Sequence, residues 1–348
     1  MERKLNVLLT GASGTVGIEV MRQLTSHDEY KLTVFDKKTK RSTGIFAELK
    51  NKATIIYGDI SNETDVAQIP AGIDVVIHLA AIIPPLADEK PDLACKVNIS
   101  GTNNIIQLLE KNSPNSFLLF SSSIAVYGDR IQNPNITTQD SLNAGKEDIY
   151  AQTKIEAENL IKNSKLNWSV FRLTAIMKNH KISKLMFHMP LSTIMEICTP
   201  KDTAKAFVEA INHRDELSRR VFNLGGGESC LITYRSFLER SFNLFGLGAV
   251  NFPEHAFAER NFHCGIYADG YKLENFLHFR NDNIDTYFED QKRSIPSIIK
   301  FFSSIFRIII KKSLLNQSEP LKAYRTKNEI QMNQFFYPKI KPVSIISI

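Results

Sequence analysis

The chain has 348 residues, of which 43% are hydrophobic and 23% are charged. This composition is that of an ordinary folded protein with a substantial core, and it excludes a disordered or collagen-like chain. No run of 18 uncharged apolar residues occurs, so the sequence predicts no membrane-spanning helix. The first residues lack a signal-length apolar stretch, and we therefore expect a cytoplasmic protein.

The net charge of +6 is unevenly distributed along the chain. Residues 291–348 contain 11 Lys and Arg but two acidic residues, a balance of +9, whereas the rest of the chain has a balance of −3. A segment of this kind favours an acidic surface as its partner. The four cysteines are far apart and lack metal-ligand spacing, so we expect reduced thiols and no metal site.

Short apolar segments alternate with helix candidates over the first 225 residues. The strand candidates are rich in Val, Ile, Leu and Phe: Asn6–Leu9, Lys31–Asp36, Ala53–Tyr57, Val75–Leu79, Phe117–Ser121, Ser169–Arg172 and Val221–Leu224. The main helix candidates between them are Val16–Leu24, Asp92–Leu109, Tyr150–Ile161 and Thr203–Ile211. This alternation predicts a Rossmann-type α/β fold, a doubly wound parallel sheet with ligands at the carboxyl ends of its strands.

A glycine-rich segment follows the first strand candidate and opens the first helix candidate. It consists of Gly11, Ala12, Ser13, Gly14, Thr15, Val16 and Gly17. Glycines allow the backbone to turn tightly and approach a pyrophosphate, and the helix N-terminus contributes N–H donors. The context of a strand before and a helix after favours a dinucleotide site over a turn with packing duties only.

Asp36 ends the second strand candidate, 19 residues after Gly17. A carboxylate at this place accepts hydrogen bonds from the ribose hydroxyls and repels a 2′-phosphate, so NAD is favoured over NADP. The neighbouring cations Lys37, Lys38, Lys40 and Arg41 point the other way, because they could attract that phosphate. NADP is therefore the less favoured alternative.

Tyr150 and Lys154 are four residues apart on a predicted helix, which puts both side chains on one face. A free phenol titrates near pH 10 and is a poor base at neutral pH. A nearby ammonium together with the positive nicotinamide ring would lower the pKa of Tyr150 and make it a general acid/base. Ser121, Ser122 and Ser123 end the fifth strand candidate, where a hydroxyl can bind a substrate oxygen.

These motifs together resemble the extended short-chain dehydrogenases/reductases, the NAD-dependent epimerase/dehydratase family. The matching pieces lie between about residues 5 and 240: TGASGTVG at 10–17, Asp36, GDI at 58–60, HLAA at 78–81, Val97-Asn98, SSSIAVYG at 121–128, YAQTK at 150–154 and FNLGGGE at 222–228. We expect residues 1–225 to form the NAD-binding Rossmann domain, with a short substrate-lobe insertion at about 174–198. A small C-terminal substrate lobe at 226–290 and a basic amphipathic tail at 291–348 would follow.

The resemblance also implies roles for individual residues. Asp59 and Ile60 would contact the adenine, whereas Leu79, Ala80 and Ala81 would line the pyrophosphate and ribose. Asn98 would support the cofactor pocket, and Lys154 would also hold the nicotinamide ribose. The catalytic hydroxyl of the family aligns with Ser123. His78 is expected to be a packed residue at a strand end and not a base.

The sequence departs from two branches of this family. Dehydratases resemble one another in an acidic pair after the catalytic hydroxyl, but Ile124 and Ala125 stand there, so dehydration is disfavoured. Sugar-nucleotide epimerases commonly carry Arg-x-x-Asn-x-x-Gly-Pro and then a long insertion; this chain departs from that motif after Arg172 and has a short apolar insertion. An apolar lid suits a small or lipidic substrate, although core packing explains the same residues. The cations Lys178, His180, Lys181 and Lys184 keep the epimerase alternative open.

Residues 298–315 of the tail contain four cations and no acid. Lys300, Ser304, Arg307 and Lys311 fall on one helical face, and bulky apolar residues occupy the others. This pattern is typical of a helix lying in a membrane interface. Docking on the protein's own body or on a dimer partner are open alternatives, and nucleic acid is not expected because no binding module is recognisable.

We therefore expect an NAD-dependent oxidoreductase that moves a hydride between an alcohol or ketone carbon of a small-molecule substrate and the nicotinamide. Its catalytic residues would be Ser123, Tyr150 and Lys154, and its substrate would be lipidic or lipid-linked. The alternatives are a nucleotide-sugar 4-epimerase and a non-catalytic NAD-binding scaffold or sensor. Peripheral association with the inner face of a membrane is predicted from the tail, and a homodimer from the family resemblance.

Overall fold

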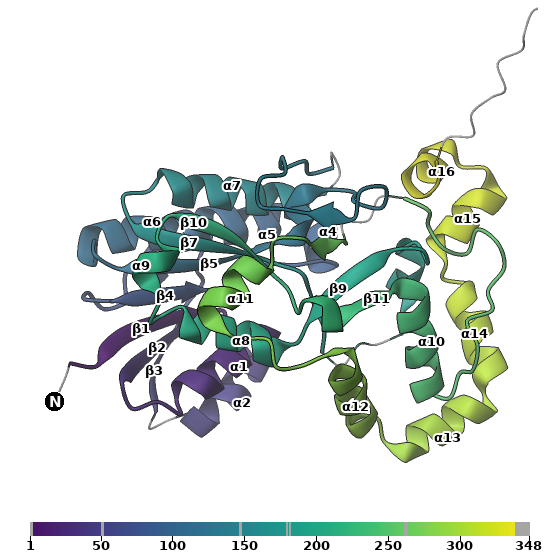
Figure 1. Cartoon of the computed structure of the whole chain (residues 1–348), viewed down its shortest axis with the longest axis horizontal. Helices are drawn as coiled ribbons and strands as arrows, with labels where there is room; N and C mark the ends of the chain where they lie inside the picture. The colour runs from purple at the N-terminus through teal and green to yellow at the C-terminus, as the bar shows by residue number, and fades with distance from the viewer. Residues whose placement is uncertain are drawn as a thin grey trace, which may run out of the picture. The chain divides into compact units, whose positions relative to one another are not determined.

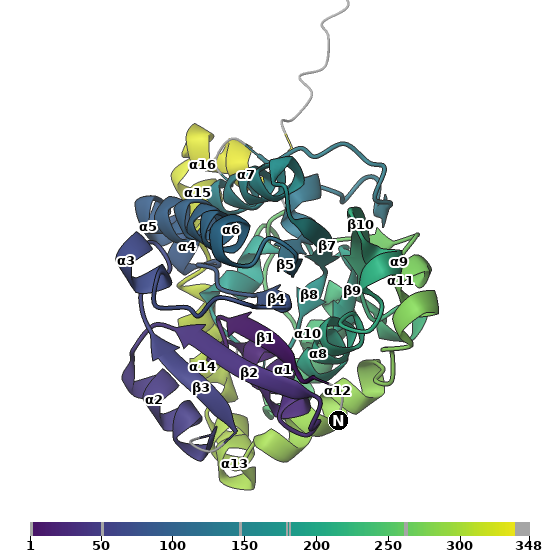
Figure 2. The same cartoon turned by 90° about the vertical axis from the view of Figure 1, so that its left-hand side faces the viewer.

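The computed structural model describes residues 3–49, 52–145, 148–178, 180, 182–260 and 264–337. The chain forms two compact units. The first contains Met1–Lys178, Met195–Leu231 and His263–Tyr287, and the second contains Asn179–Ile194, Ile232–Phe262 and Phe288–Ile348. Figures 1 and 2 show the elements of both units.

A seven-stranded sheet forms the centre of the first unit, in the order β10-β7-β5-β4-β1-β2-β3. Its strands are β1 (Leu5–Thr10), β2 (Tyr30–Asp36), β3 (Ala53–Tyr57), β4 (Val75–His78), β5 (Phe117–Ser123), β7 (Asn167–Leu173) and β10 (Arg220–Leu224). Every neighbouring pair is parallel. The seven predicted strands and the Rossmann-type fold are thereby confirmed.

Helices cover both faces of this sheet (Figures 1 and 2). They are α1 (Thr15–Leu24), α2 (Lys40–Phe46), α3 (Glu63–Val66), α4 (Leu86–Glu89), α5 (Pro91–Cys95), α6 (Gly101–Asn112), α7 (Ile149–Asn163), α8 (Pro200–Glu209), α9 (Arg214–Leu217) and α11 (Tyr271–Leu277). Successive strand residues point to opposite faces. Accordingly Leu9 packs in one buried cluster with Val20 of α1, whereas Leu8 packs in another with Ile105 of α6.

Short elements extend the first unit beyond the large sheet. Strand β8 (Ala175–Ile176) pairs with β9 (Ile194–Cys198), and β6 (Asn135–Ile136) pairs with β12 (Ile266–Tyr267), both in parallel. A π-helical turn occupies Lys96–Ser100, and 3-10 turns occupy Ala47–Leu49, Ile124–Tyr127 and Glu228–Cys230. Helix α12 (Ile284–Ser294) leads out of this unit.

The second unit is mostly helical. After strand β11 (Leu231–Thr233) come α10 (Tyr234–Leu244), α13 (Ser297–Ile305), α14 (Arg307–Leu315), α15 (Glu319–Thr326) and α16 (Glu329–Phe335), and a 3-10 turn spans Lys184–His188. The rings of Phe187, Phe252 and Phe257 pack against one another at 5.1–5.9 Å between centroids. A second small cluster joins Ala258, Ala323 and Phe335.

The tail differs from the sequence-based expectation in one respect. The single helix predicted over 298–315 is two helices, α13 and α14, which meet at Phe306, where φ is −93° and ψ is 13°. Residues 338–348 of the predicted tail lie outside the described ranges. In the part of the chain that the structure describes, no helix has the length and apolar character needed to cross a membrane.

Candidate active site

The glycine-rich loop packs directly against the chain that follows β4. Gly11 has a φ of +71°, and a Cβ on it would lie 2.6 Å from the backbone nitrogen of Ala80. A Cβ on Gly17 would lie 2.3 Å from the carbonyl oxygen of Gly11. Only glycine fits at both positions, so the loop brings the predicted residues Leu79 and Ala80 beside the start of α1.

The N-terminus of α1 has the properties that an anion site requires. Gly14 is its N-cap and supplies no side-chain cap, and the first turn contains no acidic residue. The first N–H groups of a helix point outward and carry partial positive charge. The residues present therefore fit the pyrophosphate of a dinucleotide, with Gly14, Thr15 and Val16 nearest to it.

Asp36 lies where the dinucleotide prediction needs a carboxylate. Its Oδ2 accepts the N–H of Ser13 at 2.7 Å, and its Oδ1 accepts the N–H of Lys37 at 2.7 Å. The Lys37 ammonium lies 3.0 Å from Oδ2 of Asp59. Burial opposes ionisation of Asp59, but hydrogen bonds from Ser61 and Lys37 outweigh it and lower its pKa. Lys37 is thus already paired, which weakens the argument for a 2′-phosphate.

The remaining cofactor residues named from the resemblance lie in different surroundings. Leu79, Ala80 and Ala81 follow β4 and are half-buried. The N–H of Ala80 donates to Oγ1 of Thr10 at 3.3 Å. Ile60 is buried in the core, and its carbonyl accepts from Asn104 Nδ2 at 3.0 Å. The side chain of Ile60 therefore packs mainly inside the protein.

Tyr150, Lys154 and Ser123 meet at the carboxyl end of β5. Tyr150 and Lys154 lie one turn apart on α7 and are both buried, and Ser123 ends β5 and is half-buried. A side-chain hydrogen bond joins Ser123 to Tyr150. The Lys154 ammonium donates to the carbonyl oxygen of Ser121 at 2.7 Å. The structure thus brings the three predicted catalytic side chains together.

Burial dominates the titration of the two α7 groups. It raises the pKa of Tyr150 to about 12, against the hydrogen bond from Ser123 and with the help of the Asp148 charge. It lowers the pKa of Lys154 to about 7, although Glu158 opposes this shift. The sequence predicts a lowered pKa for the Tyr150 phenol, but burial within the protein raises this pKa. Lys154 is not among the groups that lower it.

Asn98 fixes α7 to the loop after β4. It lies in the π-helical turn, a feature common at functional sites. Its Oδ1 accepts the N–H of Ile82 at 2.8 Å, and its Nδ2 donates to Oγ1 of Thr153 at 2.9 Å. Thr153 in turn donates to the carbonyl of Tyr150 at 2.8 Å. Asn98 thus holds the helix that carries the predicted catalytic pair.

His78 is a packed residue at a strand end. It is fully buried, and its ring nitrogens lie 2.7 Å and 3.0 Å from the hydroxyls of Thr10 and Thr102. Burial, with a contribution from the Lys154 charge, lowers its pKa to about 3. A histidine with this lowered pKa stays neutral at physiological pH, and both of its ring nitrogens are already engaged with hydroxyl groups.

A buried polar network behind the site is missing from the sequence-based prediction. Ser122 donates to Glu158 at 2.6 Å, and Glu158 accepts two hydrogen bonds from Arg172 at 2.8–2.9 Å. Arg172 also donates to the Tyr127 hydroxyl at 2.8 Å, which donates to Asn223 at 2.7 Å. The spacing of Glu158, four residues after Lys154 on the same helix face, is a signal that could have found it.

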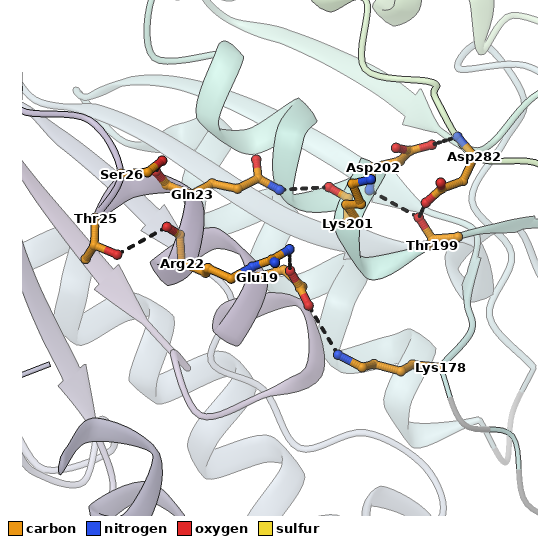
Figure 3. A network of polar contacts seen from close by, with 10 residues as sticks. All are labelled: Glu19, Arg22, Gln23, Thr25, Ser26, Lys178, Thr199, Lys201, Asp202 and Asp282. Carbon is orange, nitrogen blue, oxygen red and sulfur yellow. Dashed lines mark hydrogen bonds and ion pairs between the residues drawn. The ribbon is translucent and has the colours of Figure 1, made fainter. Parts of the chain in front are cut away.

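Two of the cations in the insertion, Lys178 and Lys184, are paired with carboxylates. Lys178 lies 3.2 Å from Glu19 of α1, which also pairs with Arg22 (Figure 3). Lys184 pairs with Glu319 at 3.0 Å within the second unit. Lys181 lies outside the described residues, and burial lowers the pKa of His180.

The apolar residues of this insertion are mostly core residues. Met186, Phe187 and Met189 are buried, whereas Leu185 is exposed. The apolar lid is therefore not supported by these side chains. Figure 3 also shows that α1 is tied to α8, since Gln23 donates to the carbonyl of Lys201 at 3.0 Å.

The parallel sheet, the glycine-rich loop after β1 and the Ser, Tyr and Lys cluster at β5 and α7 are the features expected from the resemblance to the extended short-chain dehydrogenases/reductases. The sequence profile of the 3-beta hydroxysteroid dehydrogenase/isomerase family matches residues 8–175. The chain is thus similar to this family over slightly less than half of its length, in the region that carries most of the motifs.

Two curated relatives are similar to less than half of the chain. A 3-beta-hydroxysteroid dehydrogenase of Mycolicibacterium neoaurum is 30% identical over 161 residues, which are 44% of this chain and 42% of that protein. The N-acetyl-alpha-D-glucosaminyl-diphospho-ditrans,octacis-undecaprenol 4-epimerase of Escherichia coli O157:H7 is 31% identical over 159 residues, 45% of this chain and 43% of that protein. The chain thus spans about two fifths of the length of these relatives.

A solved structure extends the likeness in fold to most of the chain. The UDP-glucuronic acid 4-epimerase from Bacillus cereus, in complex with UDP-glucuronic acid and NAD, has a TM-score of 0.69 and 21% identity. The match covers 86% of this chain and all of that chain. This likeness supports the fold.

Proposed function

We propose that the protein is an NAD-dependent oxidoreductase that moves a hydride between an alcohol or ketone carbon of its substrate and the nicotinamide. The observation that carries the proposal is the cluster of half-buried Ser123 with buried Tyr150 and Lys154 at the carboxyl end of the sheet. The glycine-rich loop lies at the same end, because parallel strands all end there.

The residues of the chain have distinct roles in this reaction. Bound NAD supplies the hydride acceptor. Gly11, Gly14 and Gly17 shape the pyrophosphate cradle, and Asp36 accepts hydrogen bonds from the ribose hydroxyls. Ser123 holds the substrate oxygen while the hydroxyl proton passes to the Tyr150 oxygen. Lys154 holds the nicotinamide ribose, and the phenolate of Tyr150 is favoured by the positive nicotinamide ring.

A lipidic or lipid-linked substrate has two supports. The names of both curated relatives specify such molecules, a steroid and an undecaprenyl-diphosphate sugar. The exposed apolar and cationic residues of the tail fit an anionic membrane surface, and we propose that the protein is peripheral at the inner face of a membrane. The homodimer stays a prediction from the family resemblance.

A nucleotide-sugar or lipid-linked sugar 4-epimerase is the second candidate. It is favoured by the Escherichia coli relative and by the Bacillus cereus epimerase, and it uses the same hydride step twice. Native mass spectrometry of the desalted protein separates the two candidates. Stoichiometric NAD that survives desalting indicates the epimerase, because that cycle regenerates its cofactor, whereas an empty protein that binds added NAD reversibly indicates the dehydrogenase.

The Tyr150→Phe variant tests the proposed role of the phenol. We expect turnover with 3-hydroxysteroids or undecaprenyl-linked sugars to fall at least 100-fold (about the contribution of one general acid/base), with NAD affinity close to wild type. Tyr271→Phe is the matched control, since Tyr271 is exposed on α11. If Tyr150→Phe turned over like the control, the assignment of the acid/base would be wrong. Absence of turnover in the wild type despite NAD binding would favour the non-catalytic scaffold.

A further inference from the structure

Helices α13 and α14 present polar side chains to the loop at 246–251 of the same unit. A Cβ on Gly246 would lie 2.7 Å from the Lys300 carbonyl oxygen and 3.3 Å from Ser304 Cβ, so this loop packs against the polar row of α13. On α14 the Lys311 ammonium donates to the Ala249 carbonyl oxygen at 2.7 Å and also contacts the Asn251 amide oxygen. A surface helix of a soluble protein normally buries its apolar side instead.

Most apolar residues on and between the same two helices are exposed, whereas Leu314 is buried. Eight large side chains have exposed fractions between 47% and 76%: Ile298, Ile299, Phe301, Phe302, Ile305, Phe306, Ile308 and Ile309. Large exposed apolar patches mark interaction sites, and four cations without an acid accompany this one. The positive charge of these four cations favours an anionic lipid surface over a protein partner that has few acidic residues.

A cavity of about 390 Å³ lies between α14 and the loop at 247–251. Its lining includes two cations, Arg307 and Lys311, and no carboxylate among the described residues. Arg307 has no hydrogen-bond or ion-pair partner within the part of the chain that the structure describes. Burial and the nearby Arg307 charge lower the pKa of Lys311, which is consistent with two like charges sharing one site.

We propose that this cavity binds the phosphate head group of an anionic membrane lipid while the exposed apolar residues enter the bilayer interface. The inference rests on the membrane association proposed above. Arg307 has five N–H donors in a planar fork that suits phosphate oxygens. Lys311 is held in place by Ala249 and Asn251, and one of its three donors remains for the ligand.

Binding of full-length protein to phosphatidylcholine vesicles, with and without phosphatidic acid, tests the proposal. Arg307→Gln should weaken binding to the phosphatidic acid vesicles about tenfold, beyond the roughly fivefold that one surface cation contributes. Lys322→Gln removes an equal charge from the exposed surface of α15 and should weaken binding by no more than about fivefold. Ile305→Ser should also weaken binding, whereas Ile330→Ser on α16 should not.

The results separate the cavity from the membrane association. Equal losses for Arg307→Gln and Lys322→Gln would overturn the cavity and leave a diffuse attraction to the membrane. Failure of the wild type to bind either vesicle would overturn the membrane association and the cavity with it. A third outcome is that Arg307→Gln abolishes binding of inorganic phosphate but leaves vesicle binding unchanged. This outcome would make the cavity a site for free phosphate and contradict the lipid assignment. NAD binding measured on the same samples reports on the proposed enzyme independently.

Discussion

Burial acts in opposite directions on the two titrating groups of α7. It disfavours the charged form of each, so it raises the pKa of the Tyr150 phenol and lowers that of the Lys154 ammonium. Lys154 is therefore close to its midpoint near pH 7. In the proposed reaction, the positive nicotinamide ring is the additional charge that favours the phenolate.

The lowered pKa of Lys154 predicts a pH-dependent stability. Between pH 7 and 9 the unfolded chain binds a proton at this lysine that the folded chain has released, so stability rises with pH. The linkage amounts to about 2 kcal/mol over this interval, and Lys154→Met should abolish that part of the rise. The interval ends at pH 9 because burial raises the pKa values of Cys198 and Cys264, which makes stability fall at higher pH.

Urea unfolding of the wild type and the variant at pH 7 and pH 9 measures this linkage. Lys162→Met is the control, since this lysine lies on the same helix but is partly exposed. The control should keep the wild-type rise. An identical rise in Lys154→Met would show that the lysine is charged in the folded protein and that the assigned pKa is wrong.

At the scale of the helix, alanine substitutions at two glycines, Gly17 of α1 and Gly44 of α2, are expected to change stability in opposite directions. Gly17→Ala places a Cβ 2.3 Å from the Gly11 carbonyl, so α1 must move away from the loop. We expect a loss of several kcal/mol in unfolding free energy, of the order of a severely overpacked core site, and loss of NAD binding. Gly44→Ala on α2 meets no atom within 4 Å and should stabilise by up to about 1 kcal/mol.

Chemical denaturation of the two glycine variants decides the matter. A Gly17→Ala protein as stable as Gly44→Ala would contradict the tight packing of the loop on α1. If Gly17→Ala is insoluble, hydrogen exchange at the start of α1 in the wild type serves as the second measurement. Strong protection there is expected from the close packing.

The buried ion pair behind the site makes a prediction for α7 and β7. Glu158→Gln removes the charge that compensates Arg172, whose side chain is 3% exposed. Loss of one partner of a buried pair costs about 3–5 kcal/mol in unfolding free energy. Glu156→Gln, an exposed change on the same helix, should cost less than about 0.5 kcal/mol. Equal effects in thermal unfolding would show that the pair does not hold these elements together.

Elements that depend on local pattern could be predicted from the sequence. The strands of a parallel sheet are buried on both faces and therefore read as continuous apolar runs, and all seven were found. Helix α7 was placed correctly, so Tyr150 and Lys154 fall on one face. The π-helical turn at Asn98 and the break at Phe306 were not predicted, because neither segment contains a glycine or proline that interrupts its helical pattern.

At the scale of the whole molecule, contacts between distant residues limit the prediction. Tyr127 and Arg172 are 45 residues apart, and Asn223 meets Asp269 across 46 residues. Apolar periodicity says nothing about which buried polar groups pair, since each pair is fixed by the folded sheet. The orientation of α13 and α14 could not be predicted for the same reason. A helical wheel distinguishes the polar face from the apolar face but does not show which face packs against the rest of the protein.

Calorimetric titration of the purified protein with NAD and NADP tests most directly whether this chain uses NAD. Any nucleotide that co-purifies is first identified and removed. We predict saturable binding of NAD, with NADP at least about tenfold weaker because Asp36 repels the 2′-phosphate, and a smaller difference between the two in Asp36→Ser. Absence of binding by either nucleotide, or tighter binding of NADP, would contradict the account.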